Sequence, residues 1–343
     1  MTEKKNGRRT VRFPHEPSVL AGACVVGKKE GEGPLRKWFD EIGEDSYFGQ
    51  KSWEKAESVM LQRALALCCD KAGCSQSSID FAFTGDLLNQ CTGSAFALRD
   101  SGVSLLGLYG ACSTMAEAMT LAAMSVDGGF AETAAALTSS HFCSAERQFR
   151  LPLEYGGQRP QSSQWTVTGA GAVLIGKTGP GPYITDATIG CITDAGVKDA
   201  NNMGAAMAPA AYDTLKTHFE DTGREPSYYS AIITGDLGKV GHEILTELFR
   251  DDGVDLGVCS LDCGMLIYDM AAQDVHAGGS GCGCSASVFS GHILQRMTRG
   301  EWPRVLFAAT GALLSPTTIQ QGESIPGICH AVSLSMERSG QGC

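Results

Sequence analysis

The sequence predicts an α/β fold built from two related halves. The motif TGDL at residues 84–87 recurs at residues 234–237, an offset of 150. Residues 110–113 match residues 282–285, and residues 136–138 match residues 308–310, both at an offset of 172. The difference of 22 between the two offsets places an insertion in the second half, within residues 253–278. Three matches in the same order predict a duplicated strand–helix–strand–helix–strand unit with parallel strands and right-handed crossovers.

The composition is that of a globular protein with an acidic surface. Of the 343 residues 43% are hydrophobic, which is ample for a core, and the formal net charge is −11. The acidic balance argues against a nucleic-acid partner. No uncharged apolar run approaches the ~18 residues of a membrane helix, and the apolar residues 17–27 read as a strand rather than as a signal peptide. We therefore expect a cytoplasmic protein that is not secreted.

Hydrophobic spacing assigns the main elements of each half. Strands are expected at residues 17–27, 79–83, 102–108, 133–139, 231–233 and 325–332. Helices are expected at residues 53–71, 115–126, 209–220 and 240–249, and residues 143–163 read as a loop. The expected halves are residues 1–190 and residues 191–343, the second with an additional C-terminal strand that lies beyond the repeat.

Cys112 lies between the apolar run 102–108 and a helical segment. Thr114 followed by Glu117 predicts a capping box at that helix start. Unpaired backbone N–H groups and the helix dipole favour an anion there. We therefore expect a lowered pKa for the Cys112 thiol and a place for a bound carboxylate. The alternative is a small buried thiol without a function.

The chain has 14 cysteines, most of which we expect to be buried free thiols in a cytoplasmic protein. Cys259, Cys263, Cys282 and Cys284 are spaced as CxxxC and CxC. These spacings fit zinc poorly, so no metal site is expected.

The string GACST at residues 110–114, in a duplicated α/β chain, resembles the thiolase superfamily. This resemblance implies a five-layer α-β-α-β-α fold, a homodimer, and a cysteine that is acylated in that superfamily. Longer strings resemble one family within it, stage V sporulation protein AD, over almost the whole chain. They lie at residues 138–142, 164–172, 202–211, 277–286 and 310–316.

The resemblance to that family implies a protein of endospore formers that binds dipicolinic acid (pyridine-2,6-dicarboxylate) and is required for its uptake into the forespore. It implies a cytoplasmic location in the mother cell or forespore. Association with the spore inner membrane would be peripheral, through membrane-embedded proteins of the same sporulation operon. No cofactor is expected, and calcium is left open as a chelate of the ligand.

This sequence lacks two of the residues that condensing members of the superfamily use together with the cysteine. These members pair the cysteine with a His in a loop after one strand and with a His or Asn before a helix. Here those loops read TGDLG (residues 234–238) and GSGCG (residues 279–283). Without His or Asn, condensation lacks its acid, its base and the donors for the second carbonyl. We therefore expect a binding protein rather than a condensing enzyme.

Ligand-binding residues are expected where the two pseudo-equivalent helix starts face one cavity. Glycines there leave backbone N–H groups bare for a compact anion, and a flat apolar wall suits planar, doubly negative dipicolinate. His141 and His330 are candidate donors, with a structural role as the alternative. The candidates are Cys112, Ser113, His141, Asp194, Asp199, Asn202, Gly235, Ser280, Gly281, Cys282 and His330.

Two further groups of candidate residues can be interpreted either as part of the binding site or as ordinary surface residues. One of Arg147, Arg150 or Arg159 is a possible carboxylate partner, although loop arginines are commonly solvated. Residues 193–203, which hold Asp194, Asp199 and Asn202, are either a turn-rich linker or a lip of the cavity that meets calcium.

Two rival functions stay open. The first is an acyltransferase that uses Cys112 with a relocated base, for which His141 or His330 should lie within hydrogen-bond reach of the thiol. The second is a structural subunit whose vestigial pocket is closed by side chains.

Overall fold

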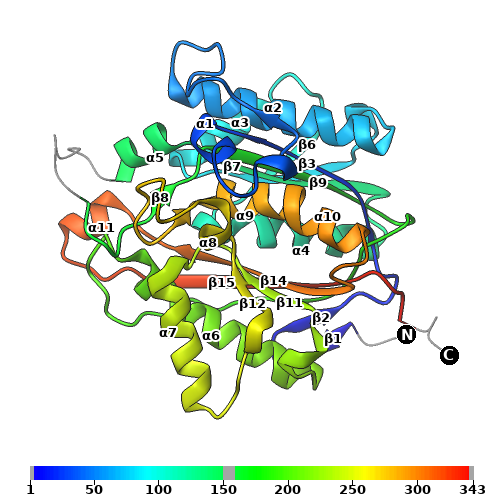
Figure 1. Ribbon diagram of the computed structural model, residues 1–343. Coiled ribbons are helices and arrows are strands. Elements are labelled where there is room, and N and C mark those ends of the chain that lie inside the picture. The colour runs from blue at the N-terminus through cyan, green and yellow to red at the C-terminus, as the bar shows by residue number, and fades with distance from the viewer. Residues whose placement is uncertain (1–3, 150–158, 340–343) are drawn as a thin grey trace.

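The computed structural model describes residues 4–149 and 159–339, which form five alternating layers (Figure 1). One outer layer holds α2 (Trp53–Ala72) and α3 (Thr92–Leu98), and the other holds α6 (Met203–Thr222) and α7 (Gly238–Asp251). The middle layer, between two sheets, consists of α4 (Thr114–Asp127), α9 (Cys282–Val288) and α10 (Leu294–Thr298). The expected α-β-α-β-α arrangement is confirmed.

The two sheets have the same strand order. The first runs β3 (Ser18–Val26), β9 (Gly169–Gly176), β7 (Thr133–Ser140), β5 (Phe81–Gly85), β6 (Ser104–Gly107). The second runs β10 (Tyr183–Thr188), β15 (Gly327–Ser335), β14 (Arg304–Ala312), β11 (Ala231–Thr234), β12 (Ser260–Asp262). A single residue pair of β3 and β10, Ser18 with Tyr183, joins them. Each sheet is mixed, since β9 and β15 run antiparallel to their neighbours.

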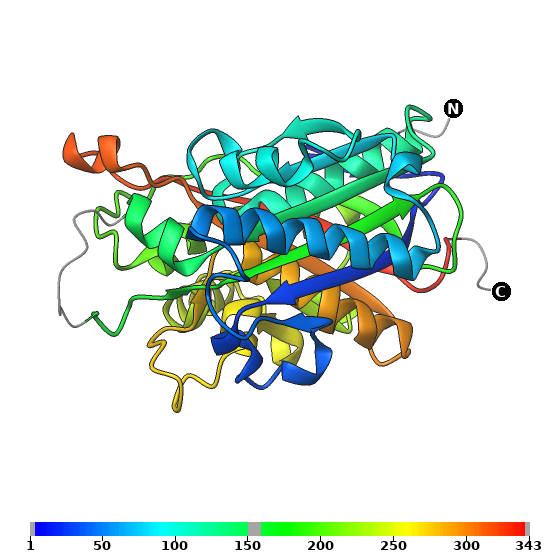
Figure 2. The ribbon, with the colours of Figure 1, turned by 90° about the horizontal axis from the view of Figure 1, so that it is seen from above.

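The remaining elements are short. They are β1 (Lys5–Asn6), β2 (Thr10–Arg12), β4 (Glu41–Ile42), β8 (Trp165–Thr166), β13 (Gly279–Ser280), α1 (Lys28–Gly31), α5 (Phe142–Phe149), α8 (Cys263–Ile267) and α11 (Pro316–Gln320). Helix α2 lies along the outer face of the first sheet, against β3 and β9 (Figure 2).

The two halves that the sequence repeat predicts have the same arrangement of strands in the structure. The two TGDL motifs begin at the ends of β5 and β11 and continue into the loops that follow, and β7 and β14 are counterparts at the offset of 172. Most of the extra residues of the second half follow β12, where α8, a loop and β13 precede α9. The C-terminal strand β15 is not an addition beyond the repeat, because it occupies the place that β9 has in the first sheet. The division of the chain at residue 190 stays a prediction.

Two helices differ from the expected boundaries. Helix α6 begins at Met203 rather than at Pro209, because the Asn202 side chain caps it and the small residues that follow are helical despite Gly204. Pro209 therefore lies inside the helix, which loses one backbone hydrogen bond there. The expected loop at residues 143–163 begins instead as α5, a helix with one apolar face.

The middle layer explains the abundance of glycine and alanine. Every residue of α9 is buried, since the helix is covered by a sheet on each side. A Cβ atom at Gly171 of β9 would lie 2.3 Å from the carbonyl oxygen of Ala286, and one at Gly283 would lie 2.3 Å from that of Gly169. Only glycine at these positions lets α9 approach the strand closely enough to bring its first residues to the site described below.

None of the helices in the described ranges combines the length and the apolar character that crossing a membrane requires.

Candidate ligand-binding pocket

The starts of the two central helices meet at one point. Cys112 lies in a short 3-10 turn, Ala111–Ser113, that leads from β6 into α4, and Ser280 ends β13 just before α9. The Cys112 sulfur lies 3.9 Å from the Ser280 hydroxyl, and the Ser285 hydroxyl donates to the Cys112 carbonyl at 3.4 Å. The expectation that the pseudo-equivalent helix starts face each other therefore agrees with the geometry.

The turn that carries Cys112 is held in a special backbone conformation. Ala111 has φ of 50°, in the left-handed region that L-residues other than glycine seldom adopt. On the other side of the site Gly281 has φ of 105°. A Cβ atom at Gly311 of β14 would lie 2.3 Å from the Gly110 carbonyl oxygen, so this glycine lets the turn rest directly on the strand. Such conformations persist only when the surrounding structure enforces them.

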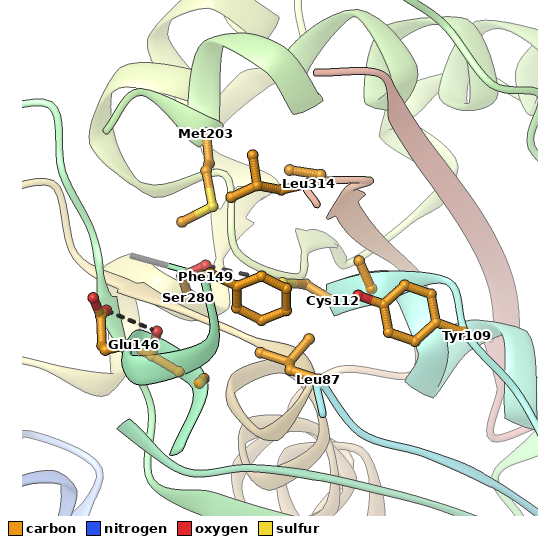
Figure 3. Close-up of a pocket in the computed structure, with 12 residues that line it drawn as sticks. Leu87, Tyr109, Cys112, Glu146, Phe149, Met203, Ser280 and Leu314 are labelled. Carbon is orange, nitrogen blue, oxygen red and sulfur yellow. Dashed lines mark hydrogen bonds between the residues drawn. The ribbon is translucent and has the colours of Figure 1, made fainter. Parts of the chain in front are cut away.

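Cys112 and Ser280 line a narrow, partly open pocket with a water-accessible volume of about 40 Å³. Its walls are mostly apolar: Leu87 lies on one side, Met203 and Leu314 lie on the other, and the Phe149 ring points in between them (Figure 3). The remaining lining residues are Tyr109, Ala111, Ala145, Glu146, Thr166 and Ala312. Of these, Glu146 accepts a hydrogen bond from Thr166 at 3.1 Å.

Asp236, which sequence reasoning did not select, is the centre of the polar side of the site. Its Oδ2 atom accepts hydrogen bonds from the Ser280 hydroxyl and from the Gly281 N–H, both at 2.9 Å. Its Oδ1 atom accepts one from the Thr310 hydroxyl at 2.8 Å. The Cys112 sulfur lies next to this network, 3.9 Å from the Ser280 hydroxyl that donates to the carboxylate. Asp236 therefore connects both helix starts with β14.

A signal for Asp236 was present in the sequence. It is the aspartate of the second TGDL copy, and its counterpart Asp86 in the first copy is buried as well. Asp86 accepts hydrogen bonds from the backbone N–H groups of Leu88 and Ser94. A carboxyl group directly after a buried strand, present in both halves, indicates a structural or chemical role at the carboxyl end of each sheet.

The expected activation of the cysteine is wrong in direction. Burial, reinforced by the nearby Asp236 carboxylate, raises the pKa of the Cys112 thiol well above its ordinary value. Burial likewise raises the pKa of Asp236 to about 6, against the hydrogen bonds that lower it. The helix start contributes a smaller effect of the opposite sign. The site therefore holds a neutral thiol beside a carboxyl group.

The capping box expected at the start of α4 is not formed. Thr114 accepts a hydrogen bond from the Gly110 N–H at 3.1 Å and donates to the Ala111 carbonyl at 2.7 Å. Oε2 of Glu117 is buried without a hydrogen-bond partner in the described part of the chain. The turn at Ala111 places Thr114 inside the helix rather than at its cap.

Several expected site residues lie behind the pocket rather than in its wall. Ser113 donates to the Gly110 carbonyl at 2.7 Å, and the Cys282 thiol donates to the Ser139 carbonyl at 2.9 Å. Gly235 packs against β14, where a Cβ atom would lie 2.9 Å from the Cα atom of Ala309. Gly281 contributes its N–H to Asp236.

Neither candidate histidine reaches Cys112. Nε2 of His141 contacts the Ser46 carbonyl at 2.7 Å, and its Nδ1 accepts from the Cys143 N–H at 3.2 Å. Nδ1 of His330 accepts from the Gly190 N–H at 3.2 Å. Burial lowers the pKa of both rings, that of His330 to about 4. Both are neutral, buried side chains with backbone partners.

The linker residues lie outside the pocket. Asp194 and Asp199 accept hydrogen bonds from the backbone two residues ahead, as in Asx turns, and Asn202 caps α6. The next residue, Met203, is the one that lines the pocket. The turn-rich interpretation of this segment fits these contacts.

The three candidate arginines are placed as follows. Arg147 forms an ion pair with Glu54, and Arg159 lies over the Trp165 ring, 4.9 Å from its centroid. Arg150 lies outside the described residues. In the described ranges no group of three or more His, Cys, Asp or Glu side chains is arranged to hold a metal ion.

Two duplicated halves in five layers, with a cysteine where the two central helices begin, define a thiolase-fold protein. Solved structures with this fold superpose over most of the chain. Crystal structures of 3-oxoacyl-[acyl-carrier-protein] synthase III from Aquifex aeolicus VF5 and of OleA from Xanthomonas campestris match with TM-scores of 0.56 and 0.58, both at 12% identity. Each covers 93% of this chain, and the matches span 99% and 98% of those chains. At such identity the likeness shows the fold alone.

The family follows from sequence. The family model of stage V sporulation protein AD (SpoVAD) matches residues 7–335. Stage V sporulation protein AD of Bacillus subtilis (strain 168) is 45% identical over 337 residues, which cover 98% of this chain and 99% of that protein. The chain belongs to the stage V sporulation protein AD family, and it is a sporulation protein on a thiolase-like fold.

Proposed function

We propose that this protein binds dipicolinate during sporulation and takes part in its uptake into the forespore, without condensing chemistry. Family membership over nearly the whole chain supports the process. The observation that carries the binding role is the pocket between the two helix starts, where Cys112 and Ser280 meet and apolar walls enclose the space. The contacts of His141 and His330 with backbone groups, instead of with Cys112, support the absence of condensation.

The shape and chemistry of the pocket suit a small flat ligand. Leu87, Met203 and Leu314 offer apolar contact for an aromatic ring, and the Phe149 ring offers a face for stacking. The Ser280 hydroxyl and the Cys112 thiol stand at the inner end, where the polar edge of the ligand would meet polar side chains. The ring would lie between the walls with one carboxylate toward the helix starts.

Calcium has a role in this proposal as part of the ligand. The buried Asp236 carboxylate lies directly behind Ser280 and would repel a doubly negative ligand at close range. Chelation by Ca²⁺ neutralises dipicolinate, so the chelate enters this site at a lower electrostatic cost than the free dianion. We therefore propose that the chelate is the form that binds best.

Calorimetric titration with dipicolinate, with and without calcium, tests the proposal. We expect saturable binding that calcium strengthens, and loss of binding in Leu314→Trp, which fills the pocket. Val258→Trp is the matched control, because Val258 is fully exposed and remote from the pocket lining. Unfolding curves of all three proteins establish that the variants are folded.

Two results would contradict the proposal. The first is a wild-type protein that releases no heat and shows no thermal shift with the ligand or its chelate, which would favour a vestigial pocket in a structural subunit. The second is undiminished binding by Leu314→Trp, which would place the ligand elsewhere.

We further propose that the protein works in the cytoplasm of the mother cell or forespore, as a homodimer held peripherally at the spore inner membrane by membrane-embedded proteins of the same operon. The dimer is supported by β6, an edge strand of the first sheet in which every residue is exposed. Leu105, Leu106 and the nearby Tyr109 are each more than 40% exposed. Such an apolar strand edge is stabilised by pairing with a second copy.

An acyltransferase is the second candidate, because one observation favours it. The Cys112 sulfur lies beside the Ser280 hydroxyl, which donates to Asp236, and this carboxylate is a possible base in the place of the expected histidine. The same carboxylate can instead keep the thiol protonated, and the alkylation rate of Cys112 in Asp236→Asn distinguishes the two roles.

A further inference from the structure

We infer that Asp236 is a positioning residue that keeps Cys112 in its protonated thiol form and so suppresses the nucleophile of the thiolase-like site. The inference concerns the chain's own residues and does not depend on which ligand the pocket takes. The aspartate of the second TGDL motif would thus inactivate the cysteine that lies just before the start of α4.

The hydrogen-bond geometry is the first argument. A thiolate at Cys112 would need donors, and two stand beside the sulfur: the Ser280 hydroxyl and the Gly281 N–H. Both are directed to Oδ2 of Asp236 at 2.9 Å. The carboxylate therefore occupies the donors that would otherwise stabilise a negative charge on sulfur or on an oxyanion next to it.

The charges around the sulfur are the second argument. Ionisation of Cys112 would place a second negative charge next to the buried Asp236 carboxylate, in a region where burial already disfavours charge. The other titratable groups that face Cys112 are neutral or acidic in the described part of the chain. They are Tyr109 before the turn, Glu146 of α5, and Cys282 and Cys284 of α9.

Asp236 is poorly placed to act as a base. Burial raises the pKa of Asp236 to about 6, but the Ser280, Gly281 and Thr310 donors stabilise its charged form and keep that pKa below the pKa of the Cys112 thiol. Transfer of the thiol proton to this carboxylate would weaken those bonds. The proton therefore stays on sulfur, next to the Ser280 hydroxyl, whose own proton is held by the carboxylate.

The test is the rate at which iodoacetamide alkylates Cys112 in the full-length protein, followed by mass spectrometry of the Cys112 peptide between pH 6 and pH 10. In this reaction the thiolate sulfur forms a bond to carbon, the carbon–iodine bond breaks, iodide leaves, and the thiol proton goes to solvent. Since only the thiolate reacts, the rate reports the ionised fraction of Cys112.

Asp236→Asn removes the charge and frees an amide N–H group for the sulfur. We expect its alkylation at pH 8 to be at least about 10-fold faster than in the wild type, with the midpoint of the pH profile about one unit lower. Asp86→Asn is the matched control, because Asp86 is the buried aspartate of the first TGDL copy and holds Leu88 and Ser94 instead. Its Cys112 rate should equal that of the wild type.

Slower or unchanged alkylation in folded Asp236→Asn would overturn the inference, and a slower rate would favour Asp236 as the base of an acyltransferase. If the variant does not fold, or if the reagent enters none of the proteins, the S–H stretching band of the wild type decides. That band, assigned by its loss in Cys112→Ser, should persist at pH 9. Its disappearance below pH 8 would overturn the inference.

Discussion

The Thr310 hydroxyl donates to Asp236 at 2.8 Å, whereas the counterpart of Thr310 in the first half, Thr138, donates to the Cys282 carbonyl at 3.0 Å. The two halves share their strands and motifs, yet corresponding side chains have different partners at the junction of the central helices. In the second half the threonine supports a carboxylate beside Cys112. The two halves therefore differ in their side-chain contacts at the place where the pocket is formed.

Phe149→Ala should weaken dipicolinate binding about 10-fold, because the Phe149 ring points into the pocket and supplies a flat apolar face. Phe130→Ala is the control, since Phe130 is 77% exposed and lies outside the pocket lining. Calorimetric dissociation constants for the calcium chelate provide the measurement. Equal affinities of the two variants would argue against stacking on Phe149.

Glu57→Gln should change the pH dependence of stability. Burial, with a contribution from Asp86, raises the pKa of Glu57 to about 8, whereas its ordinary value is 4.5. Between these values the folded protein binds a proton that the unfolded chain has released. The stability of the wild type therefore falls as pH rises through this window, and the loss is complete above pH 8.

Glutamine cannot ionise, so relative to the wild type the variant should gain about 4 kcal/mol in free energy of unfolding between pH 5 and pH 9. Urea denaturation at the two pH values measures this difference. Glu247→Gln, at an exposed position of α7, should show no such change. A pH-independent difference for Glu57→Gln would mean that the carboxyl group is charged throughout this range.

Arg224→Met should destabilise the second sheet by about 3 kcal/mol. The guanidinium lies 2.8 Å from the buried Asp186 carboxylate of β10 and donates to Tyr229 and Ser333. Its removal leaves Asp186 in the interior with a distant ion-pair partner, Arg12, at 3.9 Å, as the one that remains among residues 4–149 and 159–339.

Chemical denaturation of Arg224→Met beside Arg250→Met measures this cost, because Arg250 is exposed on α7. The double variant Arg224→Met/Asp186→Asn should recover part of the stability, since no uncompensated buried charge remains. A loss no larger than that of the control would show that the ion pair contributes little to the folded state.

Leu106→Asp should dissociate the proposed homodimer. Leu106 is 44% exposed on β6, at the edge of the first sheet, and a carboxylate there would be repelled by its symmetry mate and desolvated in the interface. Sedimentation velocity should show a dimer for the wild type and for Val258→Asp, and a monomer for Leu106→Asp. A monomeric wild type at micromolar concentration would reject the dimer.

The fold was predictable because the duplication was visible. The two TGDL copies and the matches around Cys112 and Cys284 indicate the repeat. The helical spacing of apolar residues predicts α2 within one residue of its observed ends. The errors came from local signals that tertiary packing overrode. The predicted helix over residues 209–220 starts too late, because the Asn202 cap and burial of the small residues against the sheet make residues 203–208 helical.

The site was only partly predictable. Cys112 and Ser280 followed from the paired helix starts, whereas His141 and His330 were chosen by residue type and their bonds to Ser46 and Gly190 carry no sequence signal. The direction of the Cys112 pKa depends on a partner 124 positions away, Asp236, together with full burial. A helix start contributes ~1 kcal/mol or less at exposed positions, and that is too little to offset both effects.

A crystal structure of the protein grown with dipicolinate and calcium tests the binding proposal most directly. The account predicts planar density in the pocket between Leu87 and Leu314, against the Phe149 ring, with one ligand carboxylate toward Ser280 and with Cys112 unmodified. An empty pocket at saturating ligand, or density for the chelate at another place on the protein, would contradict it.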